Sequence, residues 1–225
     1  MTDDRSTRSD VSQRTEPQTL ASGRSGIDVL KLGGSLLELA TWPQRLLSWL
    51  AEQPRKHFVL VVGGGPWVDS LRQLDRQHGL GEAYCHELAG RLLSLTAGLA
   101  GRQIFRRCRD GLDVRPSVTL ADILSAPAAF DPTLWILDAG YYLLVDSPAS
   151  RQPLPCDWTV TSDSIAADVA RCLGAERLVL FKSCPPPGQG TVAELADSDS
   201  VDPYFASLAG QLPCVEWVNL RGLSE

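Results

Sequence analysis

The stretch Asp28-Val-Leu-Lys-Leu-Gly-Gly-Ser35 is a short apolar run that ends in a pair of glycines. A run of this length, closed by glycine, is typical of a buried strand that enters a turn. The same arrangement recurs at Phe58-Val-Leu-Val-Val-Gly-Gly-Gly-Pro66, where Pro66 suits the first turn of a helix. Two successive units of strand, glycine turn and helix predict an α/β fold with a mainly parallel sheet covered on both faces.

Further strands are predicted where apolar runs recur, over residues 134–137, 177–181 and 215–219. Residues 102–133 and 140–157 are assigned only coarsely, because their apolar residues follow no clear period. Helices are predicted from apolar side chains at helical spacing. The residues that carry this spacing are Trp42, Leu46, Leu47, Trp49 and Leu50; Val68, Leu71 and Leu74; Leu88, Leu92, Leu95 and Leu99; and Ile165, Val169 and Leu173.

The composition limits the class of protein. The chain has 225 residues and a net charge of -6, which argues against a nucleic-acid binder, because such proteins normally carry a basic surface. It contains no apolar run long enough to span a membrane. Its six cysteines show no metal-ligand spacing, so we expect reduced thiols and a cytoplasmic location. Residues 1–26 are polar and are expected to form a disordered tail rather than a recognition arm, and residues 27–225 a single domain.

Charged residues at strand ends are the first candidates for chemistry. Lys31 lies within an apolar strand, where an ammonium group is unfavourable unless it meets an anion or reaches the surface. Lys182 follows another apolar run in the same way. Together with the glycine turns, which are either tight turns or phosphate-binding loops, these lysines point to phosphoryl transfer, because that reaction chiefly requires electrostatic stabilisation.

A carboxylate completes this candidate site. Asp163 is expected in the first turn of a helix that Ser162 caps and Gly174 ends, where it either stabilises the helix dipole or orients the two lysines. Asp168, one turn further on, is expected at the surface. Of the histidines, His57 and His78 are expected in solvent, and His86 is a candidate for the substrate pocket.

These motifs together resemble the amino acid kinase superfamily. The similar segments are Val29-Leu-Lys-Leu-Gly-Gly-Ser35, Val61-Val-Gly-Gly-Gly-Pro66, Thr161-Ser-Asp-Ser-Ile-Ala-Ala167 and Arg177-Leu-Val-Leu-Phe-Lys182. The resemblance implies a three-layer αβα sandwich and an ATP-dependent phosphotransferase that uses Mg²⁺. It also implies a homo-oligomer whose N-terminal half, about 27–150, binds the acceptor, and whose C-terminal half, about 151–225, binds the nucleotide.

The resemblance also implies roles for individual residues. Lys31, Asp163 and Lys182 would be catalytic, although many members of the superfamily carry the second lysine further along the chain. No lysine follows Lys182 here, so it is the only candidate for that role. The residues expected to bind ATP phosphates are Lys31, Gly33, Gly34, Ser35 and Lys182, and those expected to bind the acceptor are Gly63, Gly64, Gly65, Asp69 and Thr161.

The segments Leu154–Ala166 and Val215–Leu220 resemble one branch, the aminomethylfuran phosphate kinases of methanofuran biosynthesis. This resemblance implies that the acceptor is [5-(aminomethyl)furan-3-yl]methyl phosphate, with Trp67 and Tyr84 near its ring and Asp69 near its ammonium group. Two alternatives stay open. The chain could phosphorylate another acceptor, such as isopentenyl phosphate, UMP or an amino acid, or it could bind a nucleotide or oxyanion without catalysis.

Overall fold

The computed structural model describes residues 26–54, 57–108, 111–126, 132–188, 191, 194–195 and 198–223. Six strands form one parallel sheet: β1 (Ile27–Leu32), β2 (His57–Val62), β3 (Asp113–Val118), β4 (Thr133–Leu137), β5 (Arg177–Lys182) and β6 (Val215–Asn219). Their order in the sheet is β3-β4-β2-β1-β5-β6. The predicted strands are therefore present, and β3 is an additional strand within the region that was assigned only coarsely. The expected tail lies outside the described residues, apart from Gly26.

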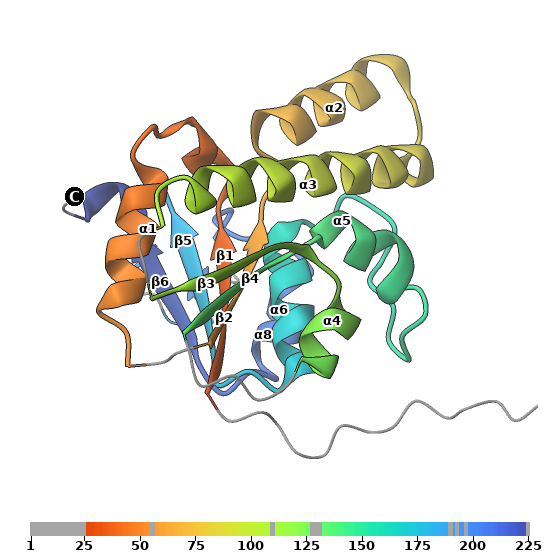
Figure 1. Ribbon diagram of the computed structural model, residues 1–225. Coiled ribbons are helices and arrows are strands. Elements are labelled where there is room, and N and C mark those ends of the chain that lie inside the picture. The colour runs from red at the N-terminus through yellow and green to blue at the C-terminus, as the bar shows by residue number, and fades with distance from the viewer. Residues whose placement is uncertain are drawn as a thin grey trace, which may run out of the picture.

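Helices cover both faces of this sheet (Figure 1). On one face α1 (Trp42–Ala51) and α3 (Glu82–Phe105) pack on the even-numbered side chains of β1, such as Leu30 and Leu32. On the other face α4 (Leu120–Ser125), α6 (Ser162–Leu173) and α8 (Phe205–Ala209) pack on the odd-numbered ones, such as Val29. The α/β fold with a mainly parallel sheet between two helical layers is thus confirmed.

The remaining elements complete the ends of these layers. A 3₁₀ turn, η1 (Gly34–Glu38), follows β1, and α2 (Gly65–His78) follows β2 and forms a hairpin with α3. A short helix, α5 (Ala139–Tyr141), continues into one turn of π-helix, η2 (Tyr142–Asp146), and a last 3₁₀ turn, η3 (Leu220–Gly222), follows β6.

The topology places a crevice beside the first strand. The chain runs from β1 through β2 to the far edge of the sheet and then returns to β5 on the opposite side of β1. In open α/β sheets, ligands bind beyond the carboxyl ends of the strands, where the strand order reverses in this way. Lys31 on β1 and Lys182 at the end of β5 both project toward the face that α6 covers, because side chains alternate along a strand.

The helix α3 was predicted correctly, but its buried face was not. Leu95 is 49% exposed and Leu99 is also exposed, whereas small residues of α3 face the protein. A side chain at Gly140 would collide with the carbonyl oxygen of Gly90, so α3 and α5 approach with their backbones in contact. Small residues are needed for that approach, and the leucines are left on the opposite side of the helix.

Two expectations about α6 are wrong. Thr161, rather than Ser162, is the N-cap residue, and its hydroxyl accepts a hydrogen bond from the backbone of Asp163. Asp168 is buried rather than at the surface, because its carboxylate accepts a hydrogen bond from the Tyr142 hydroxyl at 2.7 Å and pairs with Arg171. The expected end of the helix is confirmed.

Candidate active site

Two lysines and one carboxylate meet where β1, β5 and α6 converge. Lys31 Nζ lies 2.9 Å from Asp163 Oδ1, and Lys182 Nζ donates a hydrogen bond of 2.9 Å to Asp163 Oδ2. Lys31 and Asp163 are each 4% exposed, so the pair is shielded from water. The structure thus brings together the three residues that the sequence marked as candidates. Their catalytic roles are argued below as proposals.

The charges of this cluster perturb one another. Burial opposes ionisation of Asp163, but the ammonium groups of Lys31 and Lys182 outweigh it and lower the pKa of this carboxyl. Burial, reinforced by the charge of Lys31, lowers the pKa of Lys182 to about 8, although Asp163 acts in the opposite direction. Asp163 therefore stays ionised near neutral pH, while Lys182 is mostly protonated at pH 7 and loses its proton about 2.5 pH units earlier than an ordinary lysine.

Local structure explains how each side chain reaches this point. Asp163 lies in the first turn of α6, where the helix dipole favours a carboxylate. The Lys182 ammonium group also donates to the carbonyl oxygen of Ser200 at 2.7 Å and lies 5.4 Å from the centre of the Trp217 ring. These contacts hold Lys182 at the strand end rather than in solvent.

The two glycine turns lie against each other. A side chain at Gly34 would come within 2.2 Å of the Gly65 nitrogen, and one at Gly63 within 2.7 Å of the Gly34 nitrogen. Gly65 also has a φ of +59°, a conformation that favours glycine. Gly33 donates its backbone N–H to Phe181, and Gly63 donates its own to Leu32. Close packing therefore accounts for several of these glycines without a ligand.

A cavity of about 430 Å³ opens beside Lys182, between α2, α3 and the start of α6. The sequence-predicted residues that line it are Gly34, Ser35, Gly64, Gly65, Asp69, His86, Thr161 and Lys182. Gly33, Gly63 and Lys31 are not part of its lining. The ammonium group of Lys31 is paired with Asp163 instead. Thr161 and Asp163 also line an adjoining open cavity of about 450 Å³.

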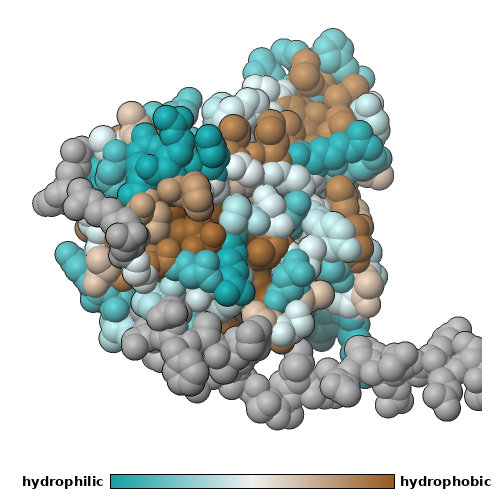
Figure 2. All heavy atoms as spheres, viewed as in Figure 1, coloured by the Kyte–Doolittle hydropathy of each residue, from teal (hydrophilic) through white to brown (hydrophobic). Residues whose placement is uncertain are grey.

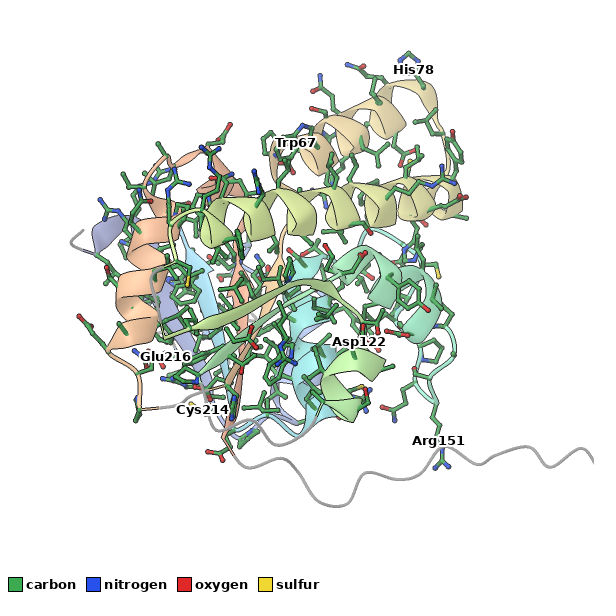
Figure 3. The ribbon with its side chains drawn as sticks, in the orientation of Figure 1. Trp67, His78, Asp122, Arg151, Cys214 and Glu216 are labelled. Carbon is green, nitrogen blue, oxygen red and sulfur yellow. The ribbon has the colours of Figure 1, made fainter. Side chains whose placement is uncertain are left out.

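The aromatic candidates lie elsewhere. Trp67 and Tyr84 are exposed and line neither of these two cavities. Figure 3 shows Trp67 at the start of α2. Trp158 lines both cavities instead, and its indole N–H donates to Asp75 on α2 at 2.8 Å. Sequence reasoning missed this tryptophan because it lies in a loop without periodic structure.

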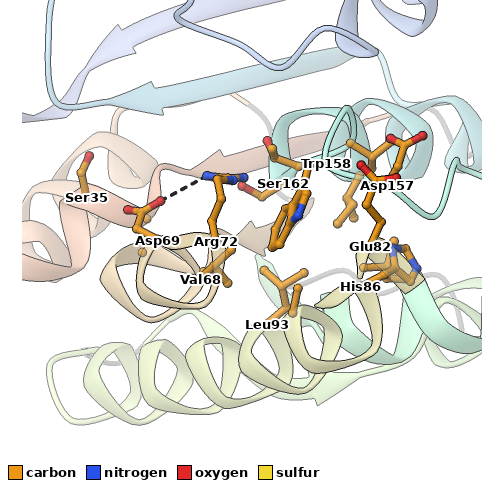
Figure 4. A pocket seen from close by; sticks show the side chains of 18 of the residues that line it. Ser35, Val68, Asp69, Arg72, Glu82, His86, Leu93, Asp157, Trp158 and Ser162 are labelled. Atoms are coloured by element: carbon orange, nitrogen blue, oxygen red, sulfur yellow. Dashed lines mark hydrogen bonds and ion pairs between the residues drawn. The ribbon is translucent and has the colours of Figure 1, made fainter. Parts of the chain in front are cut away.

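Charged side chains lie in two groups along the first cavity, and the sequence did not single out Arg72, Glu82 or Asp157 among them. Figure 4 shows Asp69 and Arg72 on one side of Trp158, and Glu82, His86 and Asp157 grouped on the other. The guanidinium carbon of Arg72 lies 4.7 Å from the centre of the Trp158 ring, and Arg72 also pairs with the exposed Asp69. The position of Arg72, two turns into the helix after the second glycine turn, is the only signal that could have marked it.

Burial lowers the pKa of His86, and the charge of Asp157 opposes this shift. His86 is therefore a neutral group at the acidic end of the cavity near pH 7.

The residues present fit a magnesium ion that is held mainly by a nucleotide. No group of three or more His, Cys, Asp or Glu side chains that could hold a metal occurs within the described residues. Mg²⁺ commonly binds through one or two carboxylates together with substrate phosphates. Asp199 lines both cavities and is a carboxylate that could take this part, whereas Asp163 is occupied by the two lysines.

Solved structures share the fold of this chain. The uridylate kinase from Archaeoglobus fulgidus aligns with a TM-score of 0.56 at 16% identity, over 86% of this chain and 91% of its own. The UMP kinase from Bacillus anthracis aligns at 0.58 and 11% identity, over 87% of each chain. The UMP kinase from Ureaplasma parvum aligns at 0.58 and 11%, over 87% and 91%. At these identities the likeness shows the fold alone. A comparison with curated proteins finds no match.

The parallel sheet between helical layers, with a cavity at the carboxyl ends of its strands, is the architecture of α/β enzymes that handle nucleotides. More specifically, the model of the amino acid kinase family matches residues 27–185, and the chain belongs to this family. It is accordingly an ATP-dependent phosphotransferase that acts on a small molecule, as the sequence predicted. None of the helices in the described ranges has the length and apolar character needed to cross a membrane.

Proposed function

We propose that the chain transfers the γ-phosphoryl group of ATP to a small phosphorylated acceptor bound in the cavity beside Lys182. The observation that carries the proposal is the pair of lysine ammonium groups that share the Asp163 carboxylate at the strand ends. Charge on the transferring group is spread over its oxygens in the transition state, so two positioned ammonium groups stabilise it. Mg²⁺ bound to the nucleotide would neutralise further charge.

The chemistry of the cluster favours an acceptor whose attacking oxygen is already anionic, and we propose a phosphate. An oxygen of the acceptor phosphate attacks the γ-phosphorus while the bond to the β-phosphate oxygen breaks, and ADP leaves. The attacking oxygen is already anionic, so no base is required. Asp163 is poorly suited as a base because its two lysine partners lower its pKa, and it acts instead by orienting them.

We further propose [5-(aminomethyl)furan-3-yl]methyl phosphate as the acceptor. Arg72 can pair with its phosphate, and the Trp158 ring offers an aromatic face beside the furan. The ammonium group suits Glu82 and Asp157 at the opposite end better than Asp69, which is already paired with Arg72. The family and the fold are compatible with other small acceptors, so the assignment depends on a direct comparison of substrates.

The test supplies Mg-ATP with a panel of acceptors: the aminomethylfuran phosphate, its analogue without the amine, isopentenyl phosphate, UMP, acetylglutamate and aspartate. We expect turnover with the first, and a fall in kcat/KM of at least about tenfold when the amine is removed, as for loss of a charged hydrogen bond. Preferred turnover of UMP or an amino acid contradicts the furan assignment alone. Tight nucleotide binding without turnover of any acceptor contradicts the enzymatic proposal.

Matched variants locate the two charges of the acceptor. Glu82→Gln should reduce kcat/KM for the amine-bearing acceptor but not for its analogue, whereas Glu87→Gln, on the exposed side of the same helix, should change neither. Arg72→Ala should reduce kcat/KM for both acceptors, with Arg91→Ala as its exposed control. Equal effects of Glu82→Gln on both acceptors would refute the placement of the ammonium group.

We also propose that the chain forms a homo-oligomer through α3. Figure 2 shows apolar surface over α2 and α3, and Leu95 and Leu99 of α3 are large apolar side chains that are exposed. Light scattering after size exclusion should report an oligomer that Leu95→Glu with Leu99→Glu converts to a monomer. Val145→Glu, an equally exposed apolar site on η2 and outside this surface, is the control. A monomeric wild-type chain would contradict this proposal.

A further inference from the structure

A buried carboxylate outside the lysine cluster gathers five hydrogen bonds at the start of α6. Asp202 Oδ2 accepts from the Thr161 backbone N–H at 2.9 Å, the Thr161 hydroxyl at 2.7 Å and the Ser164 backbone N–H at 3.0 Å. Asp202 Oδ1 accepts from the Ser164 hydroxyl and from the Phe205 backbone N–H, the latter at 3.0 Å. Asp202 is 8% exposed, so these bonds form away from water.

The bonded residues bracket the carboxylate of the lysine cluster. Asp163 lies between Thr161 and Ser164, and both of these neighbours are fixed by Asp202. The Thr161 hydroxyl alone is a weak cap, because it lies 3.5 Å from the Asp163 nitrogen. The Asp202 carboxylate therefore satisfies N–H groups at the start of α6 that this helix cannot satisfy itself.

The same short segment also holds the second lysine. Lys182 Nζ donates to the Ser200 carbonyl oxygen at 2.7 Å, two residues before Asp202. A further backbone bond joins Tyr204 to Thr159, on the loop that leads to α6. Residues 200–204 thus contact Lys182 directly, and they contact Thr161 and Ser164 on either side of Asp163.

We infer that Asp202 is a positioning residue for phosphoryl transfer, which sets the place of Asp163 between the two lysines by fixing the first turn of α6. It acts through Thr161 and Ser164 and does not itself touch the reacting atoms. This inference rests on the proposed kinase function. Small displacements of a catalytic group reduce rate strongly, so the carboxylate matters for turnover as well as for folding.

The test is Asp202→Asn, in which a single amide oxygen replaces two acceptors and the amide N–H faces N–H donors. We expect kcat to fall on the order of tenfold to a hundredfold, with a much smaller change in KM for ATP. Asp122→Asn is the control, because Asp122 also accepts hydrogen bonds at a helix start, on α4 (Figure 3), and bonds none of the residues of the lysine cluster. A folded Asp202→Asn protein with wild-type kcat overturns the inference.

A second readout requires no acceptor and so separates this inference from the proposed function. The chain contains three lysines, so ¹³Cε-lysine labelling gives few signals, and Lys182→Arg assigns the one that titrates near pH 8. In Asp202→Asn the midpoint of this signal should move by at least about half a unit, because Asp163 and Ser200 no longer hold the ammonium group as before. In Asp122→Asn it should stay in place. An unchanged midpoint in Asp202→Asn overturns the inference.

Should Asp202→Asn fail to fold, Ser164→Ala provides the same test with a smaller change. Ser164 is fully buried and its hydroxyl donates to Asp202, so the variant removes one bond and leaves the carboxylate. We expect kcat to fall by more than about threefold, as for a weakened positioning contact. If Ser164→Ala has wild-type kcat and an unmoved lysine midpoint, the bond between Ser164 and Asp202 does not position Asp163. This result would overturn the inference.

Discussion

The lowered pKa of Lys182 predicts how catalysis depends on pH. Burial and the charge of Lys31 place this pKa at about 8, and the proposed role of Lys182 requires the ammonium form. The protonated fraction in the free enzyme then falls from about 0.9 at pH 7 to about 0.1 at pH 9. We therefore expect kcat/KM for ATP to be level below pH 7.5 and to fall about tenfold between pH 7 and pH 9.

The profile of kcat should differ from that of kcat/KM. Bound phosphates are anions next to Lys182, so they raise its pKa in the enzyme–ATP complex and move the descending limb of kcat to higher pH. A coupled assay of ADP release, with coupling enzymes in excess at every pH, measures both parameters. The comparison therefore distinguishes a titration in the free enzyme from general inactivation at alkaline pH.

Lys182→Arg is the perturbation that isolates the lysine. The guanidinium group stays protonated over this range, so the descending limb of kcat/KM should disappear, although the activity at pH 7 also falls because the geometry changes. Lys31→Arg serves as the matched control and should retain a limb, because Lys182 is still present. A wild-type profile without a limb between pH 7 and 9.5, or a limb that persists in Lys182→Arg, would refute the reasoning.

The same shift has a consequence for stability. Between pH 8 and the ordinary value of 10.5, the unfolded chain binds a proton at Lys182 that the folded protein has released. The free energy of unfolding should therefore rise with pH across this window. The cost of burying the Lys182 ammonium group is largest below pH 8, where this group is protonated in the folded protein as well. The shift of about 2.5 units corresponds to roughly 3 kcal/mol at most. Denaturant midpoints of the wild type and Lys182→Met, compared from pH 7 to 10, measure the difference.

Three further predictions concern other parts of the chain. Lys31→Ala should lose about 10²-fold or more in kcat while keeping its circular dichroism spectrum, and near-wild-type kcat in the folded variant would exclude the catalytic role. Deleting residues 1–24 should leave the melting temperature and ATP affinity nearly unchanged, because such a polar sequence has few apolar side chains to pack; a large loss of stability would show that this segment contributes to the fold. Tyr142→Phe should reduce the free energy of unfolding by about 1–3 kcal/mol, since it leaves Asp168 without a buried hydrogen bond, and an unchanged denaturant midpoint would contradict this.

The glycine motifs, the strand lysines and the order of elements were readable in the sequence. Apolar runs that end in glycine indicate buried strands wherever they occur, because burial on both faces of a parallel sheet leaves no polar position along the strand. For the same reason, the unusual lysine at position 31 indicated a site. The position of Asp163 in the first turn of a helix followed from the pattern around it, and the family resemblance supplied the expectation that these groups meet.

The orientation of α3 shows what periodicity cannot determine. An apolar stripe at helical spacing identifies the helix, but the side that faces the sheet depends on which residues permit close contact. The backbone contact between Gly90 and Gly140 requires the small residues of α3 to face the protein. Leu95 and Leu99 therefore lie on the exposed side of the helix. The sequence of the helix alone does not show which of its sides is buried.

Tertiary structure alone determined which further residues join the site. Arg72, Trp158 and Asp202 lie in three separate segments, none of which marks these residues as part of a site, and each contacts a partner far away in the sequence. Four of the five hydrogen bonds of Asp202, for example, span 38 to 41 residues. Local sequence determines secondary structure through short-range sterics and burial, whereas a shared carboxylate or a ring beneath a guanidinium group exists only after packing has brought distant segments together.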